Sequence, residues 1–293
     1  MNSFDDLLNN TPAGGQNGQQ LSKEEYSAKK QAEREEVFEL SDNTALEVAG
    51  DGGKFKQYLD VQSTFDRYSA VNALLIMAQK PEATRVADFD TWKSKGGSIR
   101  GGQTGIAIVE PHPYQKEDGS PGVGYNIKKV FDISQIDTRR MSKPKSAPAH
   151  TERQLLQALI SKASVKITGV ETLPGNLGAQ TNPETGEISV RKGMEFAETF
   201  SCVAQELAAA DLRTGPDTQR DADFSAYSAA YLLCKKYGVD TEPFAFEDAP
   251  SVFEGLDAQE VKGELSQIRD VADDISGRMA RHLDKAARNA EAR

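Results

Sequence analysis

One glutamate, in the stretch CVAQELAAADL at residues 202–212, has the setting of a catalytic carboxylate. In zinc hydrolases a helix carries a histidine on each side of such a glutamate, four positions apart. Both imidazoles then reach one metal ion, and the carboxylate polarises its bound water. Here Gln205 and Ala209 stand at those positions around Glu206. Because an amide is a poor zinc ligand and a methyl group is none, the stretch predicts a helix without a metal.

The other residues able to act as ligands or nucleophiles do not restore this site. His112, His150 and His282 fall in a predicted hairpin, a linker and the carboxy-terminal helix. Cys202 and Cys234 form no CxxC pair, and Cys202 has no histidine within local reach, so a thiol-based enzyme is disfavoured. Two cysteines, no secretory signal at the amino terminus and no long apolar run predict a cytoplasmic protein without a membrane partner.

Hydrophobic periodicity predicts the elements that position these residues. Helices are expected over residues 22–40, 54–79, 88–97, 152–163, 195–212, 221–237 and 257–290. Strands are expected in two hairpins, over 98–115 with 125–136 and within 177–192, and a further strand over 165–170. The predicted fold class is α+β with two domains. The expected divisions are a disordered or helical tail (1–37), a first domain (38–140), a linker (141–152), a second domain (153–250) and a charged helix (251–293).

A set of spaced residues between positions 54 and 136 carries a family resemblance. They are Tyr68, Ser69, Asn72, Gln79, Pro81, Trp92, Gly105, Phe131, Asp132, Ser134 and Gln135. In this order they resemble the amino-terminal domain of ArdC-type antirestriction proteins, which are cytoplasmic proteins of plasmids and conjugative elements. The resemblance implies that this domain, whose strand pattern predicts a small antiparallel sheet packed on helices, binds single-stranded DNA.

Local charge agrees with that implication. Residues 54–139 hold 12 lysines and arginines against 10 acidic residues, whereas the whole chain carries a net charge of −10. Binding to single strands uses a basic track for phosphates and aromatic faces for bases. Trp92 and Tyr125 are the stacking candidates, although a lone tryptophan also fits a core position. Lys128 and Lys129 are expected on opposite faces of their strand. The nucleic-acid-binding candidates are Tyr68, Asn72, Gln79, Trp92, Lys93, Lys95, Arg100, Tyr125, Lys128, Lys129 and Gln135.

The second domain is similar to the zinc-metallopeptidase-like domain that follows in the same family. That similarity implies a third, acidic ligand on the next helix, at a position that falls near Ser225. The degenerate metal-site positions are therefore Gln205, Glu206, Ala209 and Ser225. Gln205 and Ala209 are expected on a cleft face opposite the buried stripe of their helix. A pseudo-metallopeptidase with no metal, no cofactor and no enzyme activity is predicted.

Two functions follow from these observations. The first is a non-enzymatic mobile-element protein whose partner is single-stranded DNA, with a host restriction or nuclease component as a second candidate partner. The alternative is a protein-interaction or decoy module that does not bind nucleic acid, favoured by the overall acidity and the final helix. The apolar stripe of that helix either docks on its own domain or binds a partner; it consists of Leu265, Ile268, Val271, Ile275, Met279 and Leu283.

Overall fold

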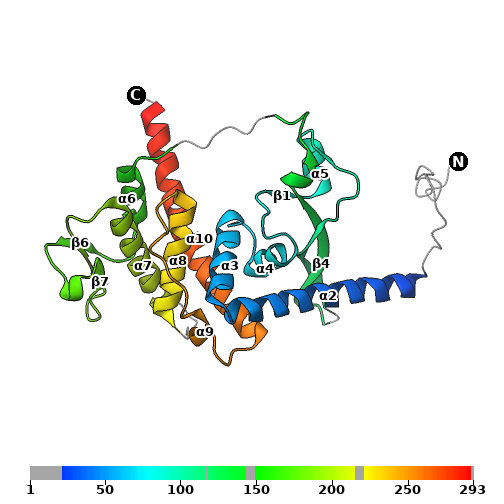
Figure 1. Ribbon diagram of the computed structural model, residues 1–293, viewed down its shortest axis with the longest axis horizontal. Coiled ribbons are helices and arrows are strands. Elements are labelled where there is room, and N and C mark those ends of the chain that lie inside the picture. The colour runs from blue at the N-terminus through cyan, green and yellow to red at the C-terminus, as the bar shows by residue number, and fades with distance from the viewer. Residues whose placement is uncertain (1–21, 117, 143–148, 215–220, 292–293) are drawn as a thin grey trace.

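The structure is a computed structural model that describes residues 22–116, 118–142, 149–214 and 221–291 (Figure 1). It confirms the predicted α+β class, because the described residues form packed helices with small sheets attached to them. The predicted tail up to residue 21 and residues 143–148 of the predicted linker lie outside the described residues. Within those ranges, no helix combines the length and the apolar composition that crossing a membrane requires.

An antiparallel hairpin is the centre of the first domain. β3 (Ile106–Gln115) pairs with β4 (Pro121–Asp132), and β1 (Val86–Ala87) pairs with the other edge of β4, giving the order β1-β4-β3. A separate short pair joins β2 (Ser98–Ile99) to β5 (Ile136–Asp137). The hairpin confirms the prediction from alternating β-branched residues.

Helices α2 and α4 pack against the hairpin, α3 packs against α2 and α4, and α5 lies at the far end of the hairpin (Figure 1). Their bounds are α2 (Lys23–Ala49), α3 (Gly52–Thr64), α4 (Ala70–Gln79) and α5 (Phe89–Ser94), and a 3-10 turn, η1 (Ile133–Gln135), follows β4. The predicted first helix extends nine residues further than expected, to Ala49.

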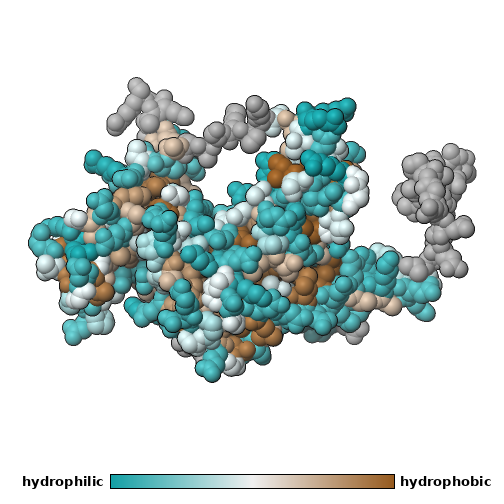
Figure 2. Space-filling view, viewed as in Figure 1, coloured by the Kyte–Doolittle hydropathy of each residue, from teal (hydrophilic) through white to brown (hydrophobic). Residues whose placement is uncertain are grey.

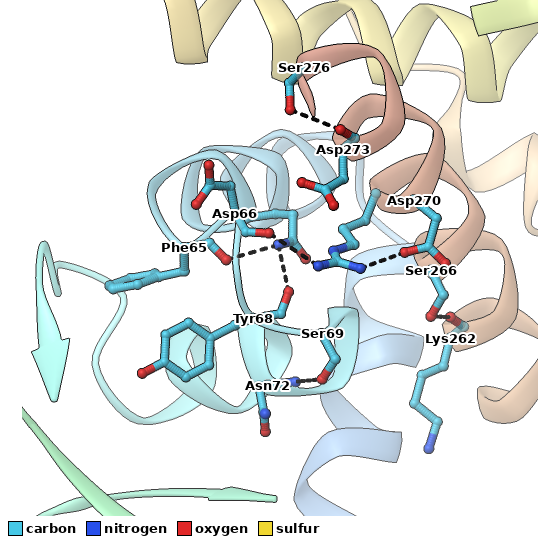
Figure 3. Close-up of polar contacts among 12 residues, drawn as sticks. Phe65, Asp66, Tyr68, Ser69, Asn72, Lys262, Ser266, Asp270, Asp273 and Ser276 are labelled. Carbon is cyan, nitrogen blue, oxygen red and sulfur yellow. Dashed lines mark hydrogen bonds and ion pairs between the residues drawn. The ribbon is translucent and has the colours of Figure 1, made fainter. Parts of the chain in front are cut away.

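The single helix predicted over 54–79 is wrong, because the chain turns between α3 and α4. Ser69 is the N-cap of α4, and its hydroxyl accepts a backbone N–H of the first turn at 3.3 Å. The buried Gln62 amide donates to the carbonyls of Phe65 and Tyr68, each at 3.2 Å, and so fixes the turn (Figure 3). The apolar pattern continues across this turn, so periodicity alone did not reveal it.

The second part of the chain begins with α6 (Glu152–Ile160). A small sheet follows in the order β6-β8-β7, in which β8 runs antiparallel to β7, as predicted, and parallel to β6. The remaining bounds are β6 (Ile167–Val170), η2 (Pro174–Asn176), β7 (Ala179–Thr181), β8 (Ile188–Arg191), α7 (Phe196–Thr214), α8 (Ala222–Tyr237) and α9 (Ala249–Val252).

The final helix, α10 (Ala258–Glu291), contacts helices of both parts of the chain. All six residues of its predicted apolar stripe are buried. They belong to one hydrophobic core that also contains Leu59 of α3, Leu74 of α4 and Tyr231 of α8. The stripe therefore docks on its own chain, which was one of the two predicted alternatives; the other was binding to a partner.

Candidate nucleic-acid interface

Two of the predicted DNA-contacting side chains, Asn72 and Gln79, bind the backbone of β3 instead. The Asn72 amide donates to the carbonyl of Val109 at 2.9 Å and accepts its N–H at 2.8 Å. The Gln79 amide makes the same two bonds to Ala107, both at 2.9 Å. Helix α4 thus lies along the edge of β3 that does not face β4, and its amides satisfy backbone groups there. The prediction that Asn72 and Gln79 contact bases is therefore corrected, because both amides bind the protein backbone.

A third amide, Gln135, also has a structural role. It accepts the N–H of Asp132 at 2.8 Å and donates to a carbonyl in the loop before β3. The buried Asp132 carboxylate accepts the backbone N–H groups of Thr84, Arg85 and Ser134 at 2.8, 2.9 and 2.8 Å. Burial raises the pKa of Asp132, but the hydrogen bonds from Ser134, Arg85 and Thr84 outweigh it and hold this pKa below its ordinary value.

The expected stacking role of Trp92 is wrong, and its core alternative is confirmed. Its side chain is 1% exposed, and the indole N–H donates to the carbonyl of Phe131 at 2.8 Å. The exposed aromatic side chain of α5 is instead Phe89, at 53%, with the Lys93 ammonium 5.7 Å from its ring centre. The sequence signal for this was Asp88, which caps α5 and places Phe89 at its first, outward position.

Five exposed cations gather at the end of the first domain that carries α5, and we call them the basic edge: Lys93, Lys95, Arg100, Arg139 and Arg140. Hydrophilic side chains cover much of this end of the molecule (Figure 2). The pairing of β2 with β5 brings the two segments together, and a depression of about 600 Å³ lies between Lys93, Arg139 and Arg140. The sequence reasoning missed Arg139 and Arg140 as site residues, because they are some 40 positions from Lys95 along the chain.

Most of the basic edge is not neutralised within the protein. Asp137 pairs with Arg139 at 2.5 Å, and this hydrogen bond is the main cause of an Asp137 pKa of about 2. Lys93, Lys95, Arg100 and Arg140 have no ion pair in the part of the chain that the structure describes. Their charges remain available to an external anion.

The two adjacent lysines of β4 differ from this pattern. As predicted, they occupy opposite faces, with Lys128 across from Ile108 and Lys129 across from Ala107. The Lys128 ammonium lies between the carboxylates of Asp88 (3.0 Å) and Glu110 (3.1 Å). Those hydrogen bonds, the one to Asp88 first, raise its pKa. Lys128 is therefore compensated inside the protein, whereas Lys129 is exposed.

Tyr68 and Tyr125 meet in a groove of about 610 Å³, which we call the tyrosine groove and which Phe38 and Arg67 also line. Tyr125 is 42% exposed, and its ring stands edge-on to Phe38 at 6.0 Å between centres. The ring of Tyr68 points away from α10 (Figure 3). Residues of α2, α4, β3, β4 and α10 line this groove, so the predicted residues divide between two surfaces rather than forming one.

The degenerate metal-site positions lie on α7 and α8, which pack directly against each other. Ala209 is 4% exposed and Ser225 is 2% exposed, so both belong to the protein interior. The expectation that Ala209 faces a cleft is wrong, because its side chain is buried in the hydrophobic core. The Glu206 carboxylate accepts a hydrogen bond from the Thr181 hydroxyl of β7 at 2.5 Å. Nearby, burial and then the charge of Glu198 raise the pKa of the Cys202 thiol, which disfavours a nucleophilic thiolate.

Comparison with known proteins finds a family similar to the first domain. Residues 47–152 match the family model for the N-terminal domain of anti-restriction factor ArdC. This part of the chain is similar to the ArdC N-terminal domain. The range includes the residues that suggested this resemblance and all five cations of the basic edge.

Solved ArdC structures share the fold. The crystal structure of the antirestriction ArdC protein from the R388 plasmid, in its metal-free form, superposes with a TM-score of 0.51 at 18% identity and covers 73% of this chain and 86% of that one. Its Mn(II)-bound structure gives 0.50 at 17% identity, covering 73% and 85%. The uncharacterized protein pXO2-81 of Bacillus anthracis is 22% identical over an alignment of 333 residues, which covers 92% of this chain. The alignment covers 56% of that relative's length.

One of these ArdC structures is Mn(II)-bound, so the fit of a metal to the predicted degenerate metal-site positions of this chain can be tested on their chemistry. Gln205 offers a neutral amide, Ala209 offers only a methyl group, and Ser225 offers a buried hydroxyl. The remaining group, the Glu206 carboxylate, already accepts a hydrogen bond from Thr181. Among the described residues, no three histidine, cysteine, aspartate or glutamate side chains converge as metal ligands. These positions do not fit a divalent metal ion.

Proposed function

We propose that this chain is a non-enzymatic antirestriction protein of a mobile element whose first domain binds single-stranded DNA along the basic edge. The observation that supports this most directly is that the five exposed cations and the exposed ring of Phe89 lie at the same end of the first domain. The chain as a whole has a net charge of −10. Phosphates of a flexible strand contact the lysines and arginines, and an unpaired base stacks on Phe89. The match to the ArdC N-terminal domain agrees with this assignment.

The tyrosine groove is a second place for bases in this proposal. Tyr68 and Tyr125 offer ring faces, and the exposed Arg67 has no ion pair within the described ranges. A strand that contacts the basic edge and continues along the hairpin would reach this groove. It would be held by stacking rather than by base-specific hydrogen bonds, because the amides of Asn72 and Gln79 are already engaged.

The second domain acts as a scaffold in this proposal and does not hydrolyse peptides. Its former metal positions provide no set of ligands, and Glu206 has no metal-bound water to activate. The proposed location is the cytoplasm, and a host restriction or nuclease component is the proposed protein partner. A decoy module that binds no nucleic acid loses one of the two observations that favoured it, because the apolar stripe of α10 is buried inside this chain.

Mobility-shift assays with a labelled single strand of about 20 nucleotides test the DNA-binding proposal. The triple variant K93Q/K95Q/R100Q should bind more weakly, and the slope of log K against log salt should fall by about 0.7 for each phosphate that the variant no longer neutralises. The control K166Q/K192Q removes two surface lysines of the second domain and should bind like the unmodified protein. Absence of any shift with folded protein at low salt would rule the proposal out.

Phe89 is tested separately. Replacing it with alanine should weaken binding by about 1–3 kcal/mol per stacked base, whereas F89Y keeps a ring and should bind normally.

Metal analysis of the purified protein tests the scaffold role. We expect far less than one manganese or zinc ion per chain, and stoichiometric metal would overturn it.

A further inference from the structure

We infer that a pocket between the end of α6 and the last turns of α10 binds a small phosphate-bearing anion. The pocket has a volume of about 370 Å³. The residues that form it include Ser161, Lys162, Arg278, Arg281, His282 and Lys285. It lies in the second part of the chain, and the inference does not depend on DNA binding by the first domain.

The charge of this pocket is uncompensated. Both terminal nitrogens of Arg278 donate to the Asp211 carboxylate at 3.0 Å, so this arginine is neutralised and fixed in place. Lys162, Arg281 and Lys285 are exposed and have no ion pair among the described residues. Three free cations around one small pocket are unexpected in a chain whose net charge is −10. An anion of two or more charges is the complementary ligand.

The geometry suits a phosphate group. Arg278, Arg281, His282 and Lys285 follow the i, i+3, i+4, i+7 spacing that places them on one face of α10. Lys162 lies in the turn after α6, with a backbone φ of +55°, a left-handed conformation that favours glycine. The Ser161 hydroxyl and the His282 Nδ1 lie 2.8 Å apart between these cations. A guanidinium can hold two phosphate oxygens at once, and the lysines add point charges.

Stabilisation of the α6 carboxyl end is the competing explanation for these cations, because that end carries a partial negative charge. The last turn is already closed by backbone bonds, from the N–H of Ser161 to Ala158 and from Ala163 to Ile160. In the described structure the side chains of Lys162, Arg281 and Lys285 make no hydrogen bond to an α6 carbonyl. Three cations also exceed what a nine-residue helix requires.

Equilibrium dialysis of the full chain against radiolabelled inorganic phosphate tests the inference, with chloride holding the ionic strength constant. Binding should saturate at one site per chain. The variant R281Q/K285Q should weaken it by about tenfold or more, because it removes the bidentate donor and a point charge. K23Q/K29Q removes the same charge from exposed positions on α2 and should change affinity by less than about twofold. Circular dichroism spectra should show that both variants are folded.

Competition then separates the sources of the phosphate group. Displacement by adenosine monophosphate at lower concentration than by phosphate identifies a nucleotide-type monoester, and equal displacement identifies the free anion; both support the site. Binding that does not saturate, or an equal loss in both variants, would overturn it. Displacement by a single-stranded oligonucleotide at a far lower concentration than by either small anion would also overturn it.

Discussion

At the level of single residues, Asn72, Gln79, Asp132 and Gln135 hold backbone groups of the first domain that would otherwise lack partners. Trp92 does the same through its indole N–H. These residues also carry the family resemblance. These five residues of the family pattern therefore indicate the fold, whereas DNA contact in our proposal depends mainly on residues outside that pattern, such as Phe89 and Lys93.

The two amides of α4 should differ in their contribution to stability. Asn72 is 8% exposed, so N72A leaves the N–H and carbonyl of Val109 unpaired in the interior and should lower the free energy of unfolding by about 2–4 kcal/mol. Gln79 is exposed, so water can replace its amide in Q79A, and the loss should be about 1 kcal/mol or less. Urea denaturation measures both. Equal, small losses would contradict the role given to Asn72.

The buried Asp132 predicts an acid-dependent stability. Its pKa in the folded protein lies below the ordinary value of 3.8, so its contribution is complete above that value and is lost as the pH falls through the folded pKa. D132N should cost about 2 kcal/mol at pH 7, and its difference from the unmodified protein should shrink below about pH 4. Urea denaturation between pH 3 and 7 is the measurement.

The control for that experiment is D118N. A hydrogen bond from Ser120 lowers the pKa of Asp118 too, but this carboxylate is exposed near the tip of the hairpin. Solvent screens it, so D118N should show little pH-dependent difference. A pH profile for D132N parallel to that of the unmodified protein would contradict the assignment.

At the level of elements, the basic edge depends on two segments that meet across the fold. α5 supplies Lys93, and the residues after β5 supply Arg139 and Arg140. Gly96 joins them at close range, with φ of +81°, and a Cβ there would lie 2.7 Å from the carbonyl oxygen of Arg140. The packing of this glycine, rather than any cation, fixes the spacing of the basic edge.

Gly96 and Gly102 therefore offer a matched pair of substitutions. G96A should push α5 away from Arg140 and weaken single-strand binding without changing any charge, and it should cost about 1–3 kcal/mol of stability. Gly102 has a similar φ of +74° but open space around its Cβ position, so G102A adds only the backbone strain. Mobility-shift assays should show impaired binding for G96A alone, and urea denaturation should measure the loss of stability in each variant. Equal binding by both variants would contradict this role.

Local patterns predicted most helices and strands but not how distant segments meet. Alternation identified the β3–β4 hairpin, and helical periodicity identified α7, α8 and α10. The turn before Ser69 was missed because its fixing contact comes from Gln62, a buried side chain in the preceding helix. The burial of Ala209 was missed because it depends on the α7–α8 packing, which no local pattern encodes.

At the scale of the whole molecule, one hydrophobic core contains residues of both parts of the chain, with α10 packed against each. This arrangement predicts that the two parts unfold together. Trp92, the one tryptophan, reports on the first part, and circular dichroism reports on all the helices. Their denaturation midpoints should coincide.

A substitution in α10 tests this coupling. I275A removes a fully buried side chain and should lower the free energy of unfolding by about 2–5 kcal/mol, shifting both signals equally. D274A changes an exposed neighbour and should shift neither by more than about 0.5 kcal/mol. A shifted dichroism midpoint with an unmoved Trp92 fluorescence midpoint would show that the two parts unfold independently.

The outer edge of β3 has a consequence for self-association. Ala107 and Val109 direct their backbone groups away from β4, where the two side-chain amides of α4 occupy them. By strand alternation the next positions with this orientation are Pro111 and Pro113, which have no N–H. None of these four positions can donate a hydrogen bond to an incoming strand. The sheet therefore cannot grow along this edge into swapped oligomers or fibrils. The same protection holds when several copies bind one DNA strand and their local concentration is high.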